Sequence, residues 1–180
     1  MKMKNLIIFM FMLAVVFSIT AQSQQVDEVK VNKYVIGDLY QPQEKSTKLA
    51  IIIGGSGDID RDGNQSMIKT DAYKKLAQHL SNNGIACFTY DKRVLRMNEL
   101  SFTESDLRFE DLVSDVGSIT KYFKAKEKYE DIILIGHSQG SLVSLIAAQE
   151  LGDAVISIAG AGESIDHILY YQLKKQLPQA

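Results

Sequence analysis

The segment GHSQG contains the pattern G-x-S-x-G, formed by Gly136, Ser138 and Gly140. An apolar strand-like run at 132–135 precedes it, and an apolar helical run from Ser141 follows it. In this order the serine occupies a sharp strand-to-helix turn, where glycines are needed because a side chain at either position would collide with a neighbouring element. The turn places the hydroxyl at a helix N-terminus, which favours developing negative charge. The pattern predicts that Ser138 is a nucleophile; the alternative is a tight turn with an idle serine.

An acyl-transfer site also needs N–H donors aimed at the developing oxyanion. Gln139, directly after the serine, would supply the first donor. The glycine-rich loop GGSG at 54–57 follows an apolar strand-like run, and Ser56 or Gly55 would supply the second donor. His137 neighbours the serine in sequence, and we expect it to orient this elbow instead of acting as the base.

The same loop continues as DIDRDG from Asp58, which matches the first half of a calcium-binding loop. The twelfth position of such a loop requires a bidentate carboxylate, but here it is Lys69, and a strand precedes the loop where an EF-hand has a helix. Calcium binding is therefore only a third hypothesis, and we predict no metal. We interpret Asp60, Arg61 and Asp62 as a local salt-bridged scaffold of the loop, with a merely solvated run of charges as the alternative.

Several motifs in the same order resemble the α/β-hydrolase superfamily, and within it exported bacterial esterases and aminopeptidase-like serine hydrolases. They are GSGDIDRDGN at 55–64, YDKRV at 90–94, GHSQG at 136–140 and SIAGAG at 157–162. The resemblance covers the chain from about Val29 to its end. Asp58 replaces a proline of the family pattern, which leaves the rigidity of the loop at 55–64 open. Val94 replaces a glycine, which leaves the shape of the loop after YDKRV open.

The resemblance implies a serine hydrolase that cleaves carboxylic esters, or peptide or thioester bonds, through an acyl-serine intermediate. It implies a small-molecule ester or peptide substrate and no cofactor. A non-catalytic exported binding domain on the same fold is the alternative from another class.

The resemblance also implies a catalytic acid and then a histidine after the serine. His167 is the only later histidine, and Glu163 or Asp166 could precede it as the acid. Asp166 and His167 are neighbours on an expected helix and do not face each other, whereas Glu163 and His167 are four residues apart and could meet. We keep His167 as a candidate base, but the family pattern places the acid and base in a C-terminal portion beyond this chain. We therefore expect a truncated hydrolase, inactive as these 180 residues, whose exposed sheet edge favours self-association.

Alternating sequence patterns supply the elements that must position these residues. We expect strands at 29–36, 49–53, 85–90, 132–135 and 154–159, and helices at 70–82, 105–126, 141–151 and 164–177. Strands that alternate with helices predict an α/β fold, with a mostly parallel sheet and helices on both faces. With two prolines and no repeats or linker, residues 22–180 should form one domain, the N-terminal portion of the hydrolase fold.

The N-terminus has the order of residues of a signal peptide: Lys2 and Lys4, an apolar run at 6–17, then small and polar residues. Cleavage after Ala21 would remove residues 1–21 and export the protein to the periplasm or the medium. The apolar run is shorter than the roughly 20 residues that span a bilayer, so we expect no stable membrane anchor after cleavage.

Charge and cysteine content exclude other classes. With 20 basic and 22 acidic residues and no basic block, the chain is not expected to bind nucleic acid. Cys87, the single cysteine, excludes a disulfide within the chain, and its apolar surroundings predict a buried thiol.

Overall fold

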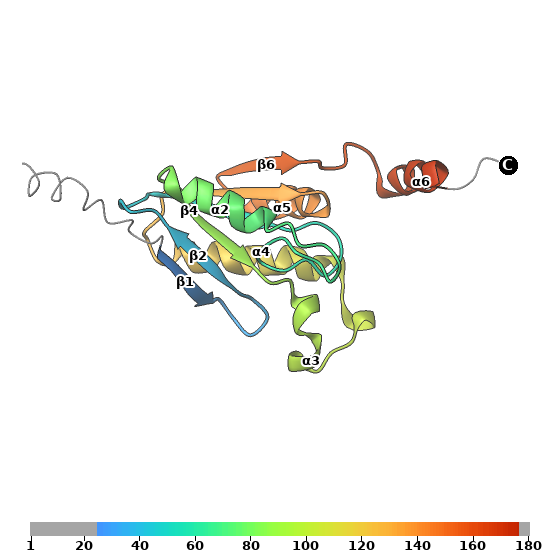
Figure 1. The fold of residues 1–180 in the computed structure, drawn as a ribbon, viewed down its shortest axis with the longest axis horizontal. Coiled ribbons are helices and arrows are strands. Elements are labelled where there is room, and N and C mark those ends of the chain that lie inside the picture. Colours follow the sequence, from blue (N-terminus) through green and yellow to red (C-terminus); the bar gives the residue numbers. More distant parts are fainter. Residues whose placement is uncertain (1–24, 177–180) are drawn as a thin grey trace, which may run out of the picture.

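The computed structural model describes residues 25–176, so the predicted signal peptide at 1–21 lies outside the described residues. Their centre is a six-stranded sheet of order β1-β2-β4-β3-β5-β6 (Figure 1). The strands are β1 (Gln25–Lys30), β2 (Ile36–Gln41), β3 (Lys48–Ile53), β4 (Ala86–Tyr90), β5 (Asp131–His137) and β6 (Ala154–Ile158). The last four strands are parallel, and β1 and β2 add an antiparallel edge. The predicted mostly parallel sheet is confirmed.

Helices cover both faces of this sheet, as predicted (Figure 1). The helical elements are α2 (Ala72–Asn82), η1 (Arg93–Arg96), α3 (Met97–Leu100), η2 (Glu104–Asp106), α4 (Phe109–Lys124), α5 (Gln139–Leu151) and α6 (Ile165–Gln176). Helix α2 packs on one face, and α4 and α5 pack on the other. Helix α6 extends beyond the end of β6, away from the rest of the sheet (Figure 1).

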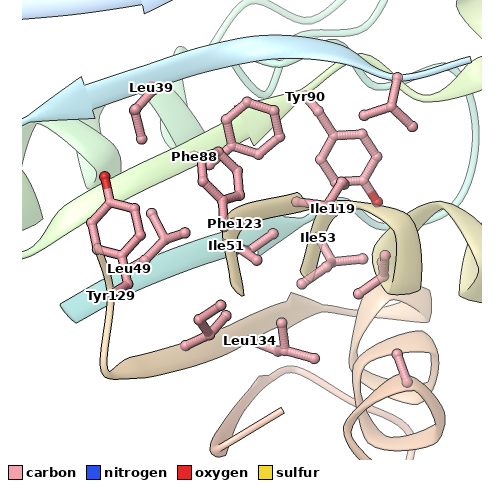
Figure 2. Packing of buried hydrophobic residues seen from close by; sticks show 14 of the residues in the cluster. Leu39, Leu49, Ile51, Ile53, Phe88, Tyr90, Ile119, Phe123, Tyr129 and Leu134 are labelled. Atoms are coloured by element: carbon pink, nitrogen blue, oxygen red, sulfur yellow. The ribbon is translucent and has the colours of Figure 1, made fainter. Parts of the chain in front are cut away.

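Strand β3 shows why an uninterrupted apolar run belongs at the centre of the sheet. Leu49, Ile51 and Ile53 point toward α4 and α5, where Figure 2 shows them packed with Phe88 and Phe123. The alternate side chains of β3 pack against α2. Because both faces are covered, every residue after Lys48 is buried, which is typical of a central parallel strand.

The single strand expected at 29–36 is wrong. These residues form the end of β1, a turn and the start of β2. The Oδ1 of Asn32 accepts the N–H groups of Tyr34 and Val35 at 2.8 and 3.0 Å, and this local bonding turns the chain. Helix α4 also begins later than expected, because Asp111 accepts the N–H of Arg108 at 2.9 Å and caps the helix there.

Apolar side chains remain exposed at the β6 edge on both faces of the sheet, and we call them the β6-edge residues. They are Leu142, Leu145 and Ile146 on α5 and, on the opposite face of the sheet, Ile156 and Ile158 on β6, each between 38% and 51% exposed. Within residues 25–176 no further element covers them. None of the helices in that range is both long and apolar enough to cross a membrane.

Candidate active site

The carboxyl ends of three neighbouring parallel strands bring the candidate residues together. In the sheet β3 lies between β4 and β5. The loop at 54–57 follows β3, Asp91 and Lys92 follow β4, and Ser138 follows β5. Ligands of open α/β sheets bind at this edge, in the crevice outside the carboxyl ends of the strands.

Ser138 occupies a strained turn between β5 and α5, with φ 52° and ψ −118°. Such a backbone conformation is costly for a residue with a side chain and persists only where the surroundings enforce it. The Ser138 N–H donates to the Ile158 carbonyl at 2.9 Å, and the Ser138 carbonyl accepts the Ser141 N–H at 3.0 Å. Neighbouring β6 and the first turn of α5 thus hold the residue in this conformation.

Both glycines of the turn lie where a side chain would collide with backbone. A Cβ built on Gly136 would lie 2.3 Å from the carbonyl oxygen of Gly140, and one built on Gly140 would lie 2.2 Å from that of Ile53. Helix α5 therefore starts directly against the end of β3, and only glycine fits at these two positions, as the sequence pattern predicts.

The loop at 54–57 lies against this turn. A Cβ built on Gly55 would lie 3.3 Å from the Cβ of Ser138. The Gly55 N–H donates to the Tyr73 hydroxyl at 3.2 Å, so it is already engaged. No hydrogen bond within the part of the chain that the structure describes uses the N–H of Ser56 or of Gln139. Of the two loop residues that we considered as second donor, the structure favours Ser56.

His137 contacts helix α2 and not the serine hydroxyl. Its Nδ1 lies 3.0 Å from the hydroxyl oxygen of Tyr73, and the two rings meet edge to face. Because that oxygen accepts the Gly55 N–H, its own proton is free to be donated to Nδ1. Tyr73, whose burial raises its pKa, thus joins the turn to the loop. Sequence reasoning did not assign this tyrosine to the site.

Lys92 is a second residue that contacts the loop at 54–57 and that sequence reasoning missed. Its Nζ donates to the carbonyls of Gly55 and Gly57 at 2.7 and 3.0 Å. The same Nζ lies 3.5 Å from Oε1 of Gln139. The residue stands inside the YDKRV motif, but one sequence gives no signal of its partners.

The prediction that Arg61 forms local salt bridges with Asp60 and Asp62 is wrong. Its guanidinium pairs with Asp91 at 2.6 Å, Asp38 at 2.6 Å and Glu28 at 3.1 Å, which lie after β4, on β2 and on β1. The partners are distant in sequence because the loop folds over the strand ends. Arg61 therefore anchors the loop across the sheet.

The two aspartates beside Arg61 act through the backbone. Oδ1 of Asp60 accepts the N–H groups of Asp62 and Asn64, and the carbonyl of Asp62 accepts the Tyr73 N–H at the start of α2. Burial raises the pKa of Asp62. Among residues 25–176, no three histidine, cysteine, aspartate or glutamate side chains are grouped as they would be around a metal ion.

His167 is not brought to Ser138. It lies on α6, and its Nδ1 is 3.9 Å from a carboxylate oxygen of Glu163, the i,i+4 contact considered from sequence. Both side chains are well exposed, and α6 projects away from the sheet (Figure 1). Within the described residues, no hydrogen bond involves Oγ of Ser138.

A cavity of about 620 Å³ opens beside the candidate donors. Lys92, Gly57 and Gln139 line its side nearest Ser138. Apolar side chains contributed by the segment after β4 and by the start of α4 line much of the rest: Val94, Met97, Leu107, Phe109 and Leu112. The charged residues Asp58, Arg93, Glu104 and Arg108 also line it. Such a cavity can hold a small molecule with both apolar and polar groups beside Gln139, the residue after the serine.

Comparisons with known proteins give the family of the chain. Residues 68–176 match the model of the family described as serine aminopeptidase, S33. The chain belongs to this family. It is an α/β-hydrolase, as the motifs indicated. A comparison with curated proteins gives no match.

Solved structures that are similar to this chain include hydrolases. A dienelactone hydrolase from Anabaena variabilis is 21% identical with a TM-score of 0.57, over 77% of this chain and 63% of its own. Est1E from Butyrivibrio proteoclasticus is 20% identical with a TM-score of 0.55, over 79% and 54%. An esterase from Pyrococcus furiosus is 17% identical with a TM-score of 0.59, over 87% and 61%. At these identities the likeness shows the fold alone, and the chain spans between 54% and 63% of the length of these three proteins.

Proposed function

We propose that this α/β-hydrolase cleaves carboxylic esters, or less readily peptide or thioester bonds, by acyl transfer to Ser138. The observation that supports it is that Ser138 lies in a strained turn against Gly55 where the strands end, and that the N–H groups of the next residues, Gln139 and Ser56, have no partner among the described residues. The cavity lined by Gln139 and Gly57 would hold a small substrate with both apolar and polar groups.

In the proposed reaction, Oγ of Ser138 attacks the ester carbonyl carbon and loses its proton to a base. The N–H groups of Gln139 and Ser56 donate to the oxyanion, whose charge the N-terminus of α5 also stabilises. Collapse of the intermediate expels the protonated alcohol and leaves an acyl-serine, which water then hydrolyses to the free acid and Ser138. The base is a group that the described arrangement does not place at Ser138: either His167 after a movement of α6, or a residue beyond this chain.

Labelling with a fluorophosphonate probe tests the proposal. Labelling at Ser138, located by mass spectrometry, that disappears in Ser138→Ala and persists in Ser114→Ala, an exposed serine on α4, would support the proposal and would show that the expected inactivity of these 180 residues is wrong. Loss of labelling in His167→Ala would make His167 the base. A folded chain that is not labelled would refute hydrolysis by these 180 residues.

A second candidate function is binding without catalysis. It is favoured by one observation, that no described histidine contacts Oγ of Ser138. Binding of a short-chain ester that is unchanged in Ser138→Ala, with no hydrolysis by the wild type, would support it. Export to the periplasm or the medium is proposed on the sequence of the leader alone, and cell fractionation tests it.

A further inference from the structure

Lys92 is a buried cation whose hydrogen bonds go mainly to backbone oxygens. It is 7% exposed, and its ammonium forms no ion pair with any residue between 25 and 176. Burying an ammonium is costly unless hydrogen bonds replace its hydration. The carbonyls of Gly55 and Gly57 supply two of them. Burial lowers the pKa of Lys92, and the nearby Asp58 carboxylate opposes this shift.

The two carbonyls flank Ser56, and this fixes the orientation of the Ser56 N–H. In a trans peptide the carbonyl of one residue and the N–H of the next point in opposite directions. Because Lys92 holds the Gly55 carbonyl, the Ser56 N–H is turned away from the ammonium. That N–H has no partner among the described residues.

The ammonium also reaches the second segment that bears a donor. Its Nζ lies 3.5 Å from the side-chain oxygen of Gln139, the first residue of α5. We propose that Lys92 is a positioning residue that holds the Ser56 and Gln139 N–H groups in a fixed arrangement around Ser138. This role rests on the proposed function, since the arrangement matters to chemistry only if Ser138 is the nucleophile.

The first test measures position and does not depend on catalysis. In ¹⁵N-labelled protein we expect the Ser56 amide to have an order parameter near 0.85, as in a rigid backbone, and to fall below about 0.6 in Lys92→Met. Lys128→Met is the matched control, because its ammonium donates to Gln41 at the far end of the sheet. It should leave Ser56 rigid. Lys92→Gln, which keeps a neutral donor, should give an intermediate value and serves if the methionine variant does not fold.

The second test measures chemistry through the rate of fluorophosphonate labelling at Ser138. In Lys92→Met the maximal labelling rate should fall by about 100-fold, as when an oxyanion donor is lost, while the affinity for the probe stays within about twofold. The proposed role of Lys92 would be overturned if the Ser56 order parameter is unchanged in Lys92→Met. It would also be overturned if Lys92→Met is less stable than the wild type but is labelled at the same maximal rate. If the wild type is not labelled, the proposed function fails, and the order parameters still decide whether Lys92 holds the loop.

Discussion

Replacing Gly140 with alanine tests the close approach that shapes the turn at Ser138. The new Cβ would lie 2.2 Å from the carbonyl oxygen of Ile53 and 2.7 Å from that of Gly54. An ordinary carbon–oxygen contact is about 3.3 Å, so the start of α5 must retreat by about 1 Å. Both neighbours are backbone at the end of a buried strand and cannot move aside as a flexible side chain would. We expect the free energy of unfolding to fall by about 2–3 kcal/mol, the upper range for overpacking.

Urea unfolding followed by circular dichroism measures this loss. Gly117→Ala is the matched control, because the Cβ of an alanine there would lie 3.7 Å from a methyl group of Leu151, an ordinary contact. In the middle of α4 it should stabilise the protein by about 0.5–1 kcal/mol. A Gly140→Ala variant within about 0.5 kcal/mol of the wild type, with the control behaving as expected, would refute the reasoning. If Ser138 is the nucleophile, the 1 Å retreat should also slow its labelling by about 100-fold.

Three further predictions concern the rest of the chain. Asp115→Ala should lower the free energy of unfolding by about 3 kcal/mol in urea titrations, because the Asp115 side chain is 3% exposed and its loss leaves buried Arg93 short of an acceptor. Removing the exposed carboxylate of Glu99 should change little, and equal losses would contradict the burial argument. The exposed apolar side chains at the β6 edge, Leu145 on α5 among them, should cause concentration-dependent self-association in sedimentation that Leu145→Glu reduces, and a wild type that stays monomeric would count against it. Burial raises the pKa of the Cys87 thiol, so iodoacetamide at pH 8 should modify it only after unfolding; rapid modification of the folded chain would exclude a protonated, buried thiol.

Most of the fold could be predicted because its signals are local. The apolar run before the loop at 54–57 and the run before Ser138 became the central strands β3 and β5. The helical spacing after Thr70 became α2. The prediction failed at 29–36, where the residues alternate as in one strand while the hydrogen bonds of Asn32 turn the chain.

By itself the sequence determined which residues stand on the turn and loop of the candidate site: a serine between two glycines after a strand, and a glycine-rich loop after another. The pattern reaches that far because steric limits on a strand-to-helix turn act within a few residues. Only the tertiary structure decided which distant groups hold them. In the sheet β3 lies between β4 and β5, so the loop after β3 comes close to residues that follow β4. Lys92 therefore forms a hydrogen bond with Gly55 in that loop, and so does Tyr73 on α2. Arg61 forms ion pairs with residues on β1 and β2. That strand order depends on how the whole sheet packs, and such contacts between residues far apart in sequence leave no periodic trace along one chain.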